Sequence, residues 1–224
     1  MLVRTWNVFH GNAVPPERRG FLREMVELVS ADGPDVVFLQ ELPAWAFGHL
    51  EAWSGMQSFC AIGARPALLN AQLGRVITAF NHGLLRSAVT GEGVAILVAR
   101  RHAVTPQPPR AIGHRRAFLS VRFDDGLLAG CFHLWASAVA NEQFRRIVEL
   151  VDDEPRVILG GDVNLRPPYG QIEGKGFSEP LADSIDQVLV RGMASMPAHA
   201  WPAERRRIAG RLMSDHAPVE ADVG

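Results

Sequence analysis

The residues with the most evident chemistry follow a short apolar run in the second half of the chain. Val157-Ile158-Leu159 leads directly into Gly160-Gly161-Asp162-Val163-Asn164. A carboxylate and an amide therefore follow the C-terminal end of a predicted buried strand, where α/β proteins collect ligand-binding and catalytic groups. The two glycines favour a sharp turn and the close approach of an anion. Taken alone, the stretch is equally typical of an ordinary strand-to-loop turn.

Three other short motifs put polar side chains at comparable positions. Asn7 closes the first predicted strand, Gln40-Glu41 closes an early apolar strand, and Ser214-Asp215-His216 lies near the C-terminus. Mg²⁺ prefers carboxylate oxygens and keeps several waters, so a site for it needs only one or two acids. A histidine beside an anionic phosphate would be charged and would donate a hydrogen bond to it. An isolated acid such as Glu41 would more often be a helix cap or a surface group.

Together these motifs resemble those of the endonuclease/exonuclease/phosphatase superfamily of metal-dependent phosphoesterases. That superfamily includes DNase I-like nucleases, abasic-site endonucleases, sphingomyelinases and inositol phosphatases. Any one short motif has a high chance rate, but six in family order at predicted strand ends make coincidence improbable. The matching segments run from the first residues to the last ten: Thr5-Trp6-Asn7, Leu39-Gln40-Glu41, Phe132-His133-Leu134, Gly161-Asp162-Val163-Asn164, Ile185-Asp186-Gln187-Val188 and Ser214-Asp215-His216-Ala217-Pro218.

The resemblance implies a role for each matching polar residue. The residues expected to bind the metal are Glu41, Asp215, Asn7 and Asp162. The residues expected to be catalytic are His133, Asp162, Asn164, Asp186 and His216. Those expected to contact the substrate phosphate are Asn7, Asn164, His133 and His216. Asp186 is expected to hold one nitrogen of His216, which would fix the tautomer and orientation of the ring.

Ordinary structural roles stay open for several of these residues. Asn7 could satisfy a backbone group at a strand end, His133 could be a core or surface histidine, and Ser214-Asp215-His216 could be a capped turn. His133 also marks a departure from the family. DNase I-like enzymes orient this histidine with a glutamate from the segment after the metal-ligand strand. Between Glu51 and Glu92 the chain has no Asp or Glu, so the partner of His133 comes from elsewhere or the ring is held differently.

Periodicity predicts strands that outnumber helices. Apolar residues at helical spacing indicate helices over 16–29, 44–53 and 141–151. Strands are predicted over 2–8, 35–39, 58–62, 75–79, 93–99, 117–123, 127–133, 157–159, 185–190 and 218–223. Asp124-Asp125-Gly126 is a hairpin signal, which implies antiparallel pairing and excludes a purely parallel sheet.

This pattern favours an α/β (α+β) fold of mixed sheets packed face to face with helices outside. It is compatible with the four-layer α/β/β/α sandwich that the resemblance implies. No linker or change of composition divides the chain, so we expect a single domain over residues 1–224.

Composition narrows the class of protein. The chain is 47% hydrophobic, as in ordinary globular proteins, and its longest apolar runs are strand-sized rather than membrane-spanning. No leader peptide is evident, so we expect a cytoplasmic protein. Cys60 and Cys131 favour buried free thiols over a disulfide.

Charge is less informative about partners. The net charge is −1, which gives no overall attraction for nucleic acid. Two groups of arginines could nevertheless contact a phosphodiester backbone or simply be a solvated surface. The first contains Arg100, Arg101, Arg110, Arg115 and Arg116, and the second contains Arg205, Arg206, Arg207 and Arg211.

The prediction is therefore a Mg²⁺- or Mn²⁺-dependent phosphodiesterase, most simply a nuclease acting on DNA or RNA. The resemblance implies direct attack by a metal-site water without a covalent intermediate. The alternative is a phosphoesterase for lipid headgroups or small phosphorylated metabolites, which would use the same site with different loops. A non-catalytic binding module on this scaffold is a distant third. We expect a monomer.

Overall fold

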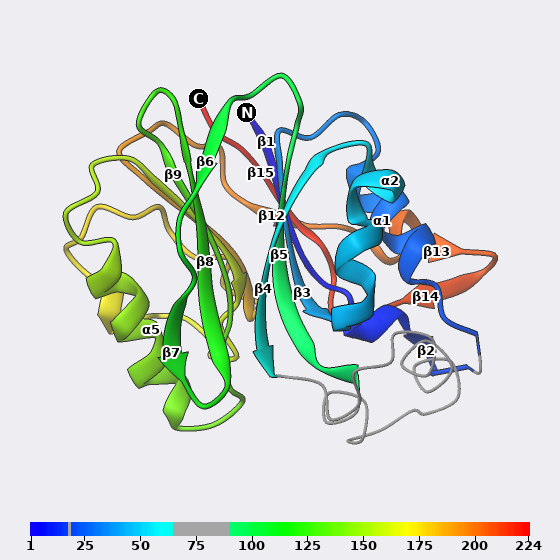
Figure 1. The fold of residues 1–224 in the computed structure, drawn as a ribbon. Coiled ribbons are helices and arrows are strands. Elements are labelled where there is room, and N and C mark those ends of the chain that lie inside the picture. The colour runs from blue at the N-terminus through cyan, green and yellow to red at the C-terminus, as the bar shows by residue number, and fades with distance from the viewer. Residues whose placement is uncertain (18, 65–89) are drawn as a thin grey trace.

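Two mixed β-sheets face each other in the computed structural model of the chain, which describes residues 1–17, 19–64 and 90–224 (Figure 1). Among these residues, the first sheet has six strands in the order β12-β15-β1-β3-β5-β4. Its strands are β1 (Leu2–Asn7), β3 (Val36–Leu42), β4 (Gln57–Ala64), β5 (Glu92–Val98), β12 (His199–Ala200) and β15 (Val219–Asp222).

The second sheet has the order β11-β10-β9-β8-β6, and β7 pairs with β8 beside it. Its strands are β6 (Val104–Pro106), β7 (Arg110–Gly113), β8 (Arg116–Phe123), β9 (Leu128–His133), β10 (Val157–Asp162) and β11 (Asp186–Arg191). A small third sheet contains β2 (Ala13–Val14), β13 (Arg207–Ile208) and β14 (Arg211–Met213).

Helices cover the outer face of each large sheet (Figure 1). The first sheet is covered by α1 (Leu22–Ser30), by the 3₁₀ helix η2 (Ala44–His49) and by α2 (Leu50–Ser54). The second is covered by α5 (Val139–Leu150). Three further 3₁₀ turns are η1 (Phe9–Gly11), η3 (Gly170–Ile172) and η4 (Ala203–Arg206). The layers thus run helix, sheet, sheet, helix, which confirms the predicted fold class.

Within the described parts of the chain, each large sheet contains one parallel pair of strands, and a helix connects the two members of each pair. In the first sheet β1 runs parallel to β3, with α1 between them in the chain. In the second sheet β9 runs parallel to β10, with α5 between them. Parallel strands end at the same edge of their sheet, so each crossover brings two carboxyl ends together. The other ladders in both sheets are antiparallel.

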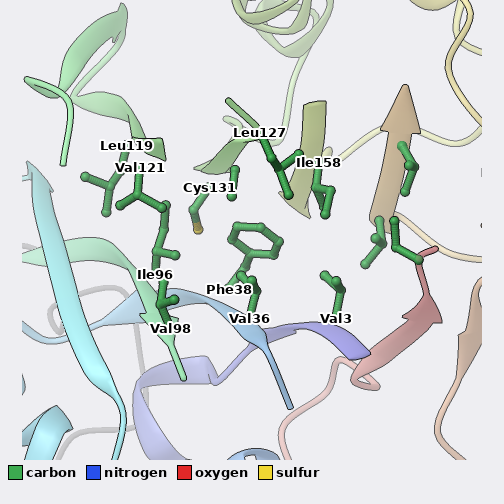
Figure 2. Packing of buried hydrophobic residues seen from close by; sticks show 14 of the residues in the cluster. Val3, Val36, Phe38, Ile96, Val98, Leu119, Val121, Leu127, Cys131 and Ile158 are labelled. Atoms are coloured by element: carbon green, nitrogen blue, oxygen red, sulfur yellow. The ribbon is translucent and has the colours of Figure 1, made fainter. Parts of the chain in front are cut away.

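Alternating side chains bury the central strands on both faces. On β3, Val36 and Phe38 point into the core between the sheets, whereas Val37 and Leu39 point into the core under α1. Figure 2 shows the ring of Phe38 reaching from the first sheet toward the strands of the second. This two-sided burial explains the continuous apolar run in the sequence.

The two glycines before Asp162 lie inside β10, which corrects the prediction that they form a turn. A Cβ atom at Gly160 would lie 2.0 Å from Cδ2 of Phe38, and one at Gly161 would lie 2.2 Å from the carbonyl oxygen of Phe132. The glycines therefore make room for a ring of the opposite sheet and for the backbone of β9. Neither has a positive φ, so β10 extends to Asp162 itself.

Several predicted boundaries shift for local reasons. The helix predicted over 16–29 begins only at Leu22, because residues 13–14 pair with β14 and the amide of Phe21 donates to the carbonyl of Gly11. The helix predicted over 44–53 is divided between η2 and α2. The strand predicted over 75–79 lies outside the described residues. Cys60 and Cys131 are free thiols, as predicted, but only Cys131 is buried.

Candidate active site

Four polar side chains meet where the two parallel pairs of strands end. Asn7, Glu41, His133 and Asp162 lie at or near the C-terminal ends of β1, β3, β9 and β10. Nδ2 of Asn7 donates to Oε1 of Glu41 and to Oδ2 of Asp162, at 3.0 Å in each case, and so joins the two sheets. Nε2 of His133 lies 3.5 Å from Oδ2 of Asp162 and 3.9 Å from Oε1 of Glu41. We call these four residues the carboxyl edge.

A histidine and two further acids extend the carboxyl edge. Asp186 begins β11 and pairs with Asp162 across the antiparallel ladder. Nδ1 of His216 lies 2.8 Å from Oδ2 of Asp186 and 3.9 Å from Oδ2 of Asp162. Nε2 of His216 lies 3.9 Å from Oδ1 of Asp215, whose side chain is half exposed. The close contact fixes the proton on Nδ1 and turns Nε2 toward the open side of the site.

Electrostatics favour a charged His216. Burial disfavours the imidazolium, but the carboxylates of Asp186, Asp162 and Asp215 outweigh it and hold the pKa of His216 above its ordinary value. Burial also raises the pKa of the Asp186 carboxyl, which the contact with His216 opposes. The pair is therefore a directional contact in which the ring donates and the carboxylate accepts.

The loop that carries Ser214-Asp215-His216 is fastened to β1. The Ser214 hydroxyl, which is fully buried, donates to the carbonyl of Asn7 at 2.7 Å and accepts from the amide of His216 at 3.0 Å. Nε1 of Trp6 and Nη1 of Arg206 both donate to the carbonyl of His216 at 3.0 Å. Ser214 thus has a structural role, because its hydroxyl links the backbone of His216 to the end of β1.

Three residues at the site hold the backbone in the left-handed region. Glu41, Asn164 and Ser214 have φ values of 54°, 51° and 56°, which non-glycine residues rarely adopt and which cluster at functional sites. Hydrogen bonds stabilise this conformation at Asn164: its amide donates to Oδ1 of Asp162 at 2.8 Å, and its Nδ2 donates to the carbonyl of Leu134 at 2.9 Å. The structure therefore places Asn164 beside Asp162, with its side-chain amide engaged by backbone.

Sequence reasoning missed the carboxylate that holds His133. Nδ1 of His133 lies 2.8 Å from Oε1 of Glu92, the first residue of β5, although the ring N–H does not point squarely at that oxygen. Arg116 contacts the same carboxylate from β8. Burial would raise the pKa of Glu92, but His133 and Arg116 outweigh it and lower the pKa to about 2. Burial likewise opposes charge on His133, and Glu92 outweighs it, so the pKa of His133 is raised.

Glu92 resolves the departure from the family pattern. The partner of His133 is Glu92, the acid that ends the acid-free stretch after Glu51. Because β5 runs antiparallel to β3, with Gly93 opposite Leu42, its first residue lies next to the strand end that carries Glu41. The available signal was a single acid between two glycines at the start of an apolar strand.

The carboxyl edge offers ligands that suit a hard divalent cation. The Glu41 side chain is 20% exposed and faces Asp162 across Asn7, and carboxylate oxygens on an open edge suit Mg²⁺, which retains several waters. The side-chain oxygen of Asn7 accepts from the amide of Phe9 at 3.0 Å, so Asn7 acts here as a donor that spaces two carboxylates. Within the described parts of the chain, Asp162, Asp186 and His216 form a second possible ligand group. A cation there would compete with the proton that His216 shares with Asp186.

The two arginine groups make internal contacts. In the second group, Arg205 pairs with Glu220 and Arg211 with Glu17, while Arg206 and Arg207 donate to backbone carbonyls. In the first group, Arg100 pairs with Glu51, Arg101 with Asp35 and Arg116 with Glu92. The arginines of the second group therefore bind acids and backbone carbonyls of the protein itself, and their guanidinium groups hold neighbouring segments together near the site.

No helix in the described ranges is both long enough and apolar enough to cross a bilayer. A model of the Endonuclease/Exonuclease/phosphatase family matches residues 5–216 of the chain. A search of curated proteins gives no match.

Solved structures share the fold at low sequence identity. The chain is similar to the endonuclease/exonuclease/phosphatase from Beutenbergia cavernae DSM 12333, with 20% identity and a TM-score of 0.70 over 100% of this chain and 71% of that one. It is similar to D. rerio TDP2 humanized by 14 mutations, with 17% identity and a TM-score of 0.65 over 100% and 98% of the two chains. The Bacteroides thetaiotaomicron VPI-5482 mannosyl-6-phosphatase Bt3783 has 13% identity and a TM-score of 0.62 over 100% and 99%.

Proposed function

Because this chain belongs to the Endonuclease/Exonuclease/phosphatase family, we propose that it is a divalent-metal-dependent hydrolase of phosphodiester bonds, with nucleic acid as its substrate. One observation carries the proposal. The amide of Asn7 holds the carboxylates of Glu41 and Asp162, which come from opposite sheets, within hydrogen-bonding distance of one nitrogen. Two histidine–carboxylate pairs flank them, the buried His133–Glu92 and the partly buried His216–Asp186.

Glu41 and Asp162 would hold the cation, with Asp215 contacting it or its waters. When bound, Mg²⁺ or Mn²⁺ neutralises charge on the phosphoryl oxygens and lowers the pKa of a bound water. The carboxylate of Asp162 lies between the two histidines, 3.5 Å from His133 and 3.9 Å from His216. We assign to Asp162 the additional role of accepting the proton of an attacking water.

The two histidines would act on the phosphate from either side. His216, kept charged by Asp186, would donate from Nε2 to a phosphoryl oxygen as negative charge develops in the transition state. His133, kept charged by Glu92, would donate from Nε2 either to the phosphate or to the leaving oxygen. In both pairs the carboxylate fixes which ring nitrogen faces the substrate. Membership of the family implies direct in-line attack by water without a covalent intermediate, and this set of roles is compatible with it.

A second candidate is the hydrolysis of a small phosphorylated metabolite. The observation that favours it is the internal engagement of Arg205, Arg206, Arg207 and Arg211, which leaves this group unsuited to track a polyanionic backbone. The same metal site would serve either substrate class.

The test compares wild type with Glu41→Gln and with the matched remote variant Glu173→Gln, whose parent residue is exposed. Substrates are single-stranded DNA, RNA, sphingomyelin, a sugar phosphate and bis(4-nitrophenyl) phosphate, each with Mg²⁺, Mn²⁺ or EDTA. Loss of the ligand charge should lower kcat/KM about 1000-fold, equivalent to about 4 kcal/mol of transition-state stabilisation. Glu173→Gln should match wild type. Full activity in EDTA refutes the proposal, and turnover of the sugar phosphate alone selects the second candidate.

A further inference from the structure

Trp135 is an exposed aromatic residue that the site chemistry does not use. It follows His133, the last residue of β9, by two positions. Leu134, between them, packs into the core under α5. Trp135 is 44% exposed, whereas His133 is buried. The indole ring is therefore outside the core, and it contacts Arg116, which in turn contacts Glu92, the partner of His133.

Two side chains hold Trp135 in place. The guanidinium carbon of Arg116 lies 5.0 Å from the centroid of the indole ring, and the same guanidinium contacts Glu92, the partner of His133. The backbone amide of Trp135 donates to Oε1 of Gln143 on α5 at 2.8 Å. Nε2 of Gln143, which is buried, donates to the carbonyl of Gly113 at 2.9 Å. Gln143 therefore fixes both the start of the Trp135 loop and the β7–β8 hairpin that carries Arg116.

The indole ring thus has the Arg116 cation against it and remains partly exposed to solvent. Its chain neighbours Ala136, Ser137 and Ala138 are small and exposed, so they leave room for a flat group. Arg115, which is exposed, precedes Arg116 in the β7–β8 hairpin, and the exposed Arg110 lies further along β7, opposite Phe118; both add positive charge to this hairpin. A planar group attached to a phosphate matches this surface, because aromatic side chains stack on bases and nearby cations attract the backbone.

We propose that Trp135 is a stacking surface for a nucleobase next to the scissile phosphate of a single-stranded substrate. This inference rests on the proposed function and specifies the substrate that the site takes. Arg116 and Gln143 are positioning residues for the stack. A lipid headgroup would not use the ring in this way, because membrane insertion requires an extended apolar face, whereas the neighbours here are small or basic.

The test uses two oligomers with equal length and equal charge. One is a ten-nucleotide oligothymidylate, and the other has the same phosphodiester backbone with a tetrahydrofuran unit in place of every nucleoside. Stacking contributes about 5- to 150-fold per base. Trp135→Ala should therefore lower kcat/KM on oligothymidylate at least fivefold more than on the abasic oligomer, and Trp135→Phe should recover most of the difference. Met196→Ala removes a remote side chain that is 66% exposed and serves as the control.

An equal loss on both oligomers would show that Trp135 only supports Arg116, and would overturn the inference, as would no loss on either. Binding of both fluorescent oligomers in the Glu41→Gln background separates this inference from the proposed function. If no oligomer is hydrolysed but binding still prefers the bases in a Trp135-dependent way, the catalytic proposal fails and the stacking surface stands. If wild type hydrolyses both oligomers equally well, the catalytic proposal stands and the stacking surface does not.

Discussion

Gly160→Ala should destabilise the protein, because the added methyl group has no space between the sheets. The new Cβ would lie 2.0 Å from Cδ2 of Phe38 and 2.6 Å from both Cε2 and Cγ. Ordinary carbon–carbon contacts are about 3.5–4.0 Å, so the ring or the strand must move by about 1.5 Å. Phe38 is fully buried in the inter-sheet core, which leaves it no open volume to enter.

Overpacking of this kind costs about 1–3 kcal/mol. Replacing glycine by alanine also returns about 0.5–1 kcal/mol by restricting the unfolded chain. Because the 2.0 Å contact is so short, we take the overpacking cost at the upper end of its range. The expected net loss in the free energy of unfolding is then about 2 kcal/mol, which lowers Tm by about 4–8 °C for a chain of this size. Urea unfolding followed by circular dichroism measures the loss directly.

Gly48→Ala is the matched control. Nothing lies within 4 Å of the position of its Cβ, and its φ is not positive, so the same substitution should be neutral or slightly stabilising. Phe38→Leu completes a double-mutant cycle, because the smaller side chain relieves the contact. The double variant should be more stable than additivity predicts by about 1 kcal/mol. Additive behaviour, or a Gly160→Ala protein as stable as wild type, would refute the packing argument for this glycine.

Two further substitutions test the electrostatics. Glu92→Gln replaces the carboxylate beside His133 with a neutral amide, so kcat should fall about 100-fold with little change in KM; an unchanged kcat in metal-dependent hydrolysis would show that Glu92 does not tune His133. Asp35 accepts from the amide of Leu2 at 2.7 Å and contacts His102 and Arg101; burial opposes its charge, but these partners outweigh it and lower its pKa. Because the folded pKa is depressed, its contribution to stability is complete above the unfolded value of about 4 and is lost as pH falls through the folded pKa. Asp35→Asn should therefore lower the free energy of unfolding by about 1–3 kcal/mol at pH 7. Below pH ~4 its free energy of unfolding should fall less steeply with pH than that of wild type. Urea unfolding that gives parallel pH profiles for both proteins would contradict this.

The sequence was sufficient to predict the assembly of the site because its motifs end apolar strands. Once Asn7, Glu41, His133 and Asp162 are assigned to strand ends, the two parallel crossovers bring them to one edge. Asp186 begins β11, which runs antiparallel to β10, and His216 lies in the loop just before β15, which runs antiparallel to β1, so both lie at the same edge. The roles of these residues stay predictions.

What the sequence could not provide was contact between segments far apart in the chain. Position 160 must be glycine because the ring of Phe38, from the other sheet, occupies the space of a Cβ atom. The residues around Gly160 in the sequence give no indication of this contact. Glu92 pairs with His133 across the sandwich, and its identity as a partner depends on the register of β5 against β3. The strands β2, β12 and β13 have two residues each, which is too short for any periodic signal.

The location of a bound divalent cation tests the central claim most directly. Crystals of the protein soaked in Mn²⁺ would reveal the ion by its anomalous scattering. We predict a peak within coordination distance, about 2.0–2.3 Å, of a carboxylate oxygen of Glu41, close to Asp162, and loss of that peak in Glu41→Gln. A peak held by Asp186 and His216 without Glu41, or no peak at the carboxyl edge under conditions that support hydrolysis, would contradict the account.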